Sequence, residues 1–170
     1  MISALVDAVL QKQLNFEQLE KLLWNCTLGF FRHLMVEVLE QLDEKLMKER
    51  DKARFKNHEK NPRSIQTLVG NVDFKRRYYK DNETDDWVYL LDEALEIESE
   101  KNIGPGLLEL AVTWATKGPS YRDARDRLTD LYGAQVLSHE AIRQALLEVG
   151  ASCELERKNQ IVAANGQREV

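Results

Sequence analysis

The sequence predicts a mainly α-helical protein with a small antiparallel β-meander. Long N-terminal helices precede a three-stranded hairpin region, and a helix-turn-helix follows at the C-terminus. Apolar residues recur every three or four positions through most of residues 2–46 and again after residue 105, which is the helical period. Residues 65–92 instead combine β-type apolar and aromatic residues with turn-forming residues. With 43% hydrophobic and 31% charged residues over 170 positions, the chain can build one ordinary domain or two very small ones.

Residues 1–60 are predicted to form a long amphipathic helical region. A first helix covers residues 2–13, and Asn15 is suited to cap a second helix. The apolar stripe of this second helix runs from Phe16 to Leu46, with a break expected near residues 27–29. A stripe of this length needs an apolar partner, either the first helix folded back or a second copy of the chain. The region is therefore a candidate for homodimerisation.

Residues 61–100 are predicted to form a basic and aromatic β-meander followed by an acidic connector. The residue before Pro62 is pushed towards extended backbone, so we expect the helical region to end there. A tight turn is expected at Gly70-Asn71 and a polar turn at residues 81–86. The turns separate three predicted strands, at residues 65–69, 72–80 and 87–91. A short acidic helical turn is expected at residues 91–98.

Residues 101–150 are predicted to form a helical domain, and residues 151–170 a polar tail. Pro105 suits the first position of a helix that continues over residues 106–116. Two short helices follow, over residues 121–132 and 139–149. Their expected N-caps and terminating glycines are Ser120, Gly133, Ser138 and Gly150. Two short helices joined by a glycine-containing turn are typical of a helix-turn-helix, although an ordinary α-hairpin has the same pattern.

Charge is distributed very unevenly along the chain. The formal net charge is −5, yet residues 48–80 carry eleven basic and four acidic residues, or +7. Residues 81–100 carry nine acidic residues and no basic residue, or −9. A basic block of this kind is the electrostatic footprint of a nucleic-acid binder, but it can equally pair with the acidic run beside it. The sequence leaves both interpretations open.

Two sets of residues are candidates for contacting DNA. The first is the basic ribbon of the predicted middle strand, whose cations suit phosphates and whose tyrosines suit stacking or backbone contacts. The second lies on the predicted helix-turn-helix, whose second helix can enter a major groove and bond to base edges. The ribbon residues are Lys75, Arg76, Arg77, Tyr78 and Tyr79, and the helical residues are Arg122, Arg125, His139, Arg143 and Gln144.

Other functional classes have little support in the sequence. The three histidines, His33, His58 and His139, lie in separate segments, and neither a phosphate-binding loop nor a zinc-protease motif occurs. We therefore predict no catalytic residue, metal ligand or small-molecule substrate for this chain by itself. The two cysteines, Cys26 and Cys153, form no metal-binding pattern, and no apolar run is long enough to cross a bilayer. A cytoplasmic protein without a membrane association is expected.

Four ordered motifs resemble the N-terminal part of ISLre-type insertion-sequence transposases, many of which are grouped as an uncharacterised protein family of transposase-like proteins. The motifs are LDEKLMKERD from Leu42, TLVGNVDFKRRYY from Thr67, VYLLD from Val88 and SYRDAR from Ser120, and the likeness covers residues 16–150. Gly118-Pro119 departs from the less disruptive pair usual in that family. The resemblance implies a further RNase-H-like domain with metal-binding carboxylates after this region. No cofactor is implied for this chain, since the divalent metal belongs to that further domain.

The resemblance therefore implies a DNA-binding N-terminal fragment of a transposase that recognises insertion-sequence DNA for transposition and recombination. From the resemblance, this chain is expected to stop short of the catalytic domain and to come from a truncated, decayed or frameshifted mobile element. The alternative is a helical oligomerisation or interaction module with no DNA-binding role.

Overall fold

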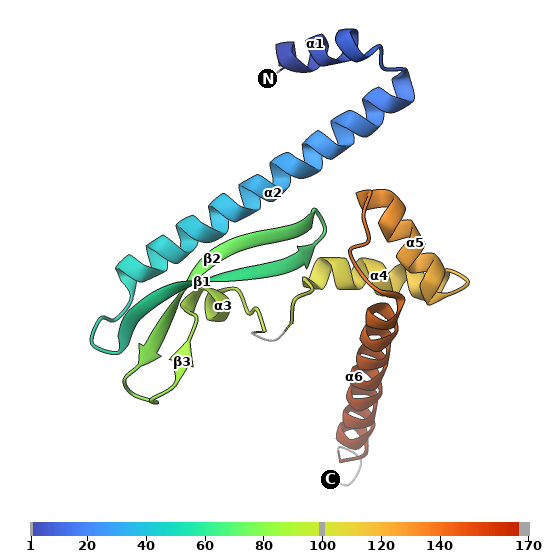
Figure 1. Cartoon of the computed structure of the whole chain (residues 1–170). Coiled ribbons are helices and arrows are strands. Elements are labelled where there is room, and N and C mark those ends of the chain that lie inside the picture. The colour runs from blue at the N-terminus through green and yellow to red at the C-terminus, as the bar shows by residue number, and fades with distance from the viewer. Residues whose placement is uncertain (1, 99–100, 167–170) are drawn as a thin grey trace. The chain divides into compact units, whose positions relative to one another are not determined.

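The computed structural model describes residues 2–98 and 101–166. It is mainly helical and contains one three-stranded antiparallel sheet, as the sequence predicts (Figure 1). The chain divides into two compact units, Met1–Asn102 and Ile103–Val170, which we call unit 1 and unit 2. No helix in the described residues is both long enough and apolar enough to span a bilayer.

Unit 1 begins with the helices α1 (Ile2–Lys12) and α2 (Phe16–Glu49). The predicted N-cap at Asn15 is confirmed as part of a capping box. The Asn15 side chain accepts the Gln18 N–H at 2.9 Å, and the Gln18 side chain accepts the Asn15 N–H at 3.0 Å. The break expected near residues 27–29 is wrong, because α2 is continuous there. The Thr27 hydroxyl donates to the Leu23 carbonyl at 2.8 Å and so does not compete with the helix.

The sheet consists of β1 (Phe55–Thr67), β2 (Gly70–Asp81) and β3 (Trp87–Val88), in that spatial order. β1 begins well before the predicted start at residue 65, so the expected end of the helical region at Pro62 is wrong. Pro62 is tolerated in β1 because this strand lies at an edge of the sheet. Thr67 pairs with Gly70, so the turn lies at residues 68–69, two residues earlier than predicted. Gly70 has φ +97°, a conformation that suits glycine.

The predicted third strand is shorter than expected. β3 ends at Val88, and the chain enters the short helix α3 (Leu90–Ala94) instead of continuing extended to residue 91. The early end of β3 leaves the first half of β2 without a strand on that side, since only Tyr79 and Lys80 of β2 pair with β3.

Helix α2 covers this open edge of β2. The Glu40 carboxylate accepts the Lys75 backbone N–H at 3.0 Å, and the Asp43 carboxylate accepts the Arg77 N–H at 2.8 Å. These two acids satisfy main-chain donors that would otherwise offer an edge for aggregation. The adjoining core consists of Ile65, Val72, Phe74 and Leu91, packed against Met35, Val36, Leu39, Leu42, Leu46, Val69 and Ile97.

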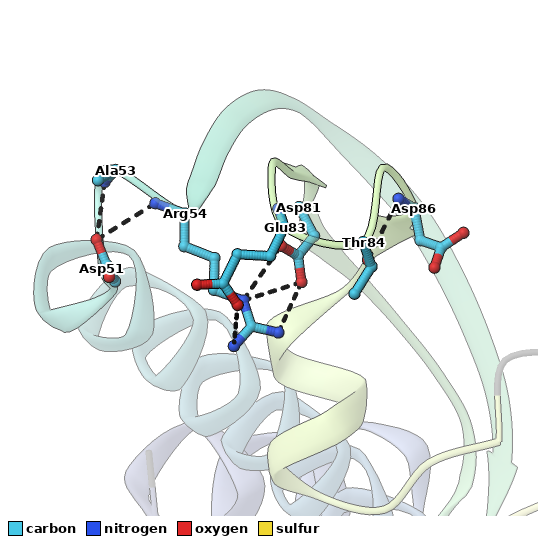
Figure 2. A network of polar contacts seen from close by, with 7 residues as sticks. All are labelled: Asp51, Ala53, Arg54, Asp81, Glu83, Thr84 and Asp86. Carbon is cyan, nitrogen blue, oxygen red and sulfur yellow. Dashed lines mark hydrogen bonds and ion pairs between the residues drawn. The ribbon is translucent and has the colours of Figure 1, made fainter.

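A polar network fastens the α2–β1 connection to the turn after β2 (Figure 2). The Arg54 guanidinium donates to both carboxylate oxygens of Asp81, with Nε at 3.1 and 3.0 Å, and it lies 3.2 Å from Glu83. These hydrogen bonds lower the pKa of Asp81. The Asp51 side chain accepts the Ala53 N–H at 2.8 Å and so shapes the turn that presents Arg54.

Unit 2 contains α4 (Pro105–Lys117), α5 (Tyr121–Tyr132) and α6 (His139–Gly166). Pro105 occupies the first turn of α4, as predicted. Ser120 caps α5 by accepting the Asp123 N–H at 3.1 Å, and Ser138 accepts the Ala141 N–H at 3.0 Å. Gly133 ends α5 with φ +69°. The buried core of the unit consists of Leu107, Ala111, Ala124, Leu128, Leu137 and Ile142.

The predicted end of the last helix at Gly150 is wrong. α6 continues to Gly166, through residues expected to form the polar tail. A single glycine inside a helix costs only about 1 kcal/mol relative to alanine, so Gly150 does not end the helix by itself. The rest of the tail, residues 167–170, lies outside the described residues.

Candidate nucleic-acid interface

The basic ribbon predicted to contact DNA is largely built into unit 1. Arg76 is only 5% exposed, and its guanidinium forms an ion pair with Asp92 and lies 3.5 Å from the centre of the Tyr89 ring. Burial lowers the pKa of Arg76 to about 10, which still leaves the side chain charged at neutral pH. Asp92 belongs to the acidic run at residues 81–100. This ion pair therefore agrees with the interpretation that the basic block pairs with the acidic run.

Arg77 is held by α2. Its guanidinium lies 2.6 Å from Asp43 and 2.6 Å from Glu44, and its side chain is 12% exposed. Lys60 also bonds to Glu44 at 3.0 Å. The hydrogen bonds from Arg77 and Lys60 lower the pKa of Glu44 to about 2. Arg77 therefore neutralises acids of α2 and is not presented to solvent.

The remaining ribbon residues differ in accessibility. Tyr79 is fully buried, and this burial raises the pKa of its hydroxyl. The Lys75 side chain is exposed, and Tyr78 is half-buried. The expectation that Arg76, Arg77 and Tyr79 contact DNA is corrected accordingly, because their side chains are enclosed within unit 1.

Unit 1 has an aromatic cluster that the sequence analysis missed. Tyr78 stacks on Trp87 with ring centroids 4.7 Å apart, and Tyr89 lies 4.7 Å from Tyr78. His58 meets the Trp87 ring edge-on at 5.2 Å. Tyr78, Lys80 and Trp87 are the residues from which this cluster could have been predicted, because Lys80 pairs with Trp87 between β2 and β3. His58 could not have been predicted, because it lies at an irregularity in β1, where the register shifts between Asn57 and Lys60. Two cluster residues have acids beside them: Glu59 lies 4.0 Å from His58, and Asp85 pairs with Lys80, which lies over the Trp87 ring. These acids make the cluster a poor surface for phosphates.

The helical candidates lie at the surface of unit 2. Arg122 is exposed and forms no ion pair within the described part of the chain. Arg125 is half-buried and pairs with Asp126 on the same helix. On α6, Arg143 and Gln144 are exposed and His139 is half-buried. All five predicted residues of this set are thus at least partly accessible from solvent.

The first turns of α6 separate exposed polar groups from buried apolar ones. Ile142 is fully buried and Ala145 is 5% exposed, and these two side chains anchor the helix to the core of unit 2. Arg143 and Gln144, which lie between them in sequence, point out of that core. Arg143 bonds to Glu140 at 2.8 Å, and Gln144 bonds to Glu148 at 3.4 Å. Exposed pairs of this kind are worth about 0–1 kcal/mol, so a ligand can displace them.

No metal site is found in the described residues, where no three His, Cys, Asp or Glu side chains come together in a metal-binding arrangement.

Most of this chain is similar to a part of longer known proteins. One UPF0236 protein of Caldanaerobacter subterraneus subsp. tengcongensis is 27% identical over 155 residues, which cover 90% of this chain and 32% of that protein. Another from the same strain is 26% identical over 157 residues, covering 91% of this chain and 32% of the relative, and its name carries eleven gene designations.

The chain thus spans about a third of the length of the curated relatives it matches. No solved structure matches it. The family model described as "Uncharacterised protein family (UPF0236)" matches residues 9–170. Because this match covers nearly the whole chain, the protein belongs to the UPF0236 family.

Proposed function

We propose that this chain is the DNA-binding N-terminal region of a transposase and that α5 and α6 of unit 2 form a helix-turn-helix that contacts the DNA. The observation that carries the proposal is the exposure of Arg143 and Gln144 at the start of α6, on a helix anchored by buried Ile142. Arginine bonds to two acceptors of guanine, and glutamine bonds to the edge of adenine. A helix fixed on one side and polar on the other suits a major groove.

Arg122 and Arg125 on α5 supply the phosphate contacts in this proposal. Such contacts fix the position of a protein on the duplex without reading its sequence. The helix that precedes a recognition helix crosses the backbone, so arginines on α5 are suitably distributed for this role.

The name of one relative supports the mobile-element part of the proposal. Eleven gene designations for a single protein in one strain fit a gene that has been copied within its genome, as the gene of an insertion sequence is. The resemblance of the four sequence motifs to ISLre-type transposases points in the same direction. The catalytic step is assigned to the part of the relatives that this chain does not cover.

Fluorescence anisotropy with two labelled duplexes tests the proposal. One duplex carries the DNA that flanks the gene encoding this chain, and the other is a scrambled version of the same composition. We expect tighter binding to the flanking DNA, with a slope of about −2 in a plot of log K against log salt for two phosphate contacts. Equal, weak binding to both duplexes without a salt dependence would overturn the proposal.

A further inference from the structure

The first part of α2 presents large apolar side chains to solvent. The hairpin tip reaches α2 at Arg32, whose guanidinium donates to the Val69 carbonyl at 2.9 Å, and the helix continues beyond it towards its N-terminus (Figure 1). Between residues 16 and 38, seven large apolar side chains are 43–74% exposed. They are Phe16, Leu23, Trp24, Phe30, Phe31, Leu34 and Val38, and we call them the α2 stripe.

The α2 stripe is nearly symmetric about Thr27. Leu23 and Phe31 each lie four residues from Thr27, and Trp24 and Phe30 each lie three residues from it. Phe16 and Val38 each lie eleven residues from it, at the two ends of the stripe. Because a helix has 3.6 residues per turn, residues three, four and eleven positions away lie on the same face as Thr27. Leu34 alone among the seven has a polar counterpart, Glu20.

This symmetry identifies the partner. We propose that a second copy of the chain packs antiparallel against the α2 stripe, with the two-fold axis at Thr27. A two-fold interface requires that residue i contacts residue j and that j contacts i. Antiparallel pairing about Thr27 meets this condition, since it sets Phe16 against Val38 and Trp24 against Phe30. The Thr27 hydroxyl already donates to Leu23, so covering it leaves no unsatisfied donor.

The size of the surface fits a dimer. The stripe is about 33 Å long at 1.5 Å per residue. Aromatic side chains bury about 150–250 Å² each, so these partly exposed residues offer about 700 Å² per copy. That is close to the ~800 Å² per partner of a standard interface, and larger than most apolar patches on monomers. The dimer is independent of DNA binding, which the proposal above assigns to unit 2.

Sedimentation velocity of the full chain over a range of concentrations tests the dimer. We expect a dimer that Phe30→Glu weakens at least about 30-fold, because the variant buries a carboxylate against Trp24 of the other copy at two symmetric places. Phe30 is 57% exposed in the unpaired chain, so the variant keeps its fold, which circular dichroism checks. The matched control is Leu95→Glu, at a 41% exposed leucine outside the stripe, and it should dimerise like the wild type. A chain that stays monomeric, or a dimer that Phe30→Glu leaves intact, overturns the proposal.

The orientation is tested by disulfide formation in a background with Cys26→Ser and Cys153→Ser. Phe16→Cys and Val38→Cys chains, one of them carrying a mass tag, are mixed and oxidised. The antiparallel dimer predicts mainly mixed disulfides between positions 16 and 38. Mainly self-linked products would mean parallel pairing and would overturn the proposed axis. Phe30→Glu chains that still bind DNA would show that failure of the dimer leaves the proposed function intact.

Discussion

Two arginines of unit 2 are expected to respond differently to substitution, because they contact different parts of DNA in the proposed complex. Arg143→Ala should cost about 1–3 kcal/mol at one base position and relax the preference there. Arg122→Ala should weaken all duplexes alike and reduce the salt slope by about 1. Titration of a panel of duplexes with single base-pair changes distinguishes the two. An unchanged base preference in the Arg143→Ala variant would contradict its role in reading bases.

Asp43 is a single residue on which the packing of α2 depends. Its carboxylate is 1% exposed and accepts both the Arg77 backbone N–H and the Arg77 guanidinium. Asp43→Ala leaves the Arg77 backbone N–H unpaired and leaves only Glu44 to hold the guanidinium, which we expect to destabilise unit 1 by about 1–3 kcal/mol. Urea unfolding monitored by Trp87 fluorescence, in a background with Trp24→Phe and Trp114→Phe, measures this loss. The exposed Asp73→Ala serves as the control, within about 0.5 kcal/mol of the wild type. A comparable effect of both changes would contradict the assignment.

The burial of Arg76 and Arg77 shows which features of single residues can be predicted from the sequence and which cannot. Composition reveals that the ribbon is basic, but the acids that hold these arginines come from distant segments. Asp43 precedes Arg77 by 34 positions, and Asp92 lies on α3, beyond the turn and the strand that follow Arg76. Only folding brings these charges together. The exposed helical candidates Arg143 and Gln144 were predictable because helix period and capping place them locally.

At the scale of elements, replacement by alanine is expected to destabilise the protein at the glycine that ends α5 and to stabilise it at the glycine within α6. Gly133 has φ +69° and open space around its Cβ position, so Gly133→Ala should cost about 1–2 kcal/mol through backbone strain alone. Gly150 also has open space but lies inside α6 without a positive φ. Gly150→Ala should therefore stabilise the protein by about 0.5–1 kcal/mol. Urea unfolding followed by circular dichroism compares them, and equal effects would contradict this account.

The contact between α2 and the hairpin is expected to weaken in acid. Arg77 and Lys60 lower the pKa of Glu44 from 4.5 to about 2. A carboxyl whose pKa is lowered by folding adds stability above its unfolded pKa, and this stability is lost as the pH falls towards the folded value. Unit 1 should therefore lose stability between pH 4.5 and about 2, and Glu44→Gln should reduce that loss. Urea midpoints at several pH values across this window test it, and an unchanged pH dependence in the variant would count against the contact.

The starts of helices were more predictable than the start of β1 or the end of α6. The N-caps Asn15, Ser120 and Ser138 each accept the N–H of the residue three positions later, so the signal is complete in the local sequence. β1 was predicted to start ten residues late because its first half is an exposed edge strand without an apolar alternation. The predicted end of α6 at Gly150 is wrong because the sequence alone does not show whether a glycine takes a left-handed or a helical conformation.

For the whole molecule, the fold gives a structural reason for the uneven distribution of charge along the sequence. The basic block and the acidic run lie within unit 1 and neutralise each other through pairs such as Arg76 with Asp92 and Arg54 with Asp81. The strongest electrostatic signal in the sequence is thus largely structural. The proposed DNA contact rests instead on a few exposed side chains of unit 2, in a chain that spans about a third of its relatives.

Hydrogen–deuterium exchange of the full chain, with and without the gene-flanking duplex, tests the central claim most directly. Exchange reports which backbone segments become protected when DNA binds. The account predicts added protection in α5 and in the first turns of α6, and no change in β2. Protection confined to residues 70–81 of β2, or no protection anywhere, would contradict it.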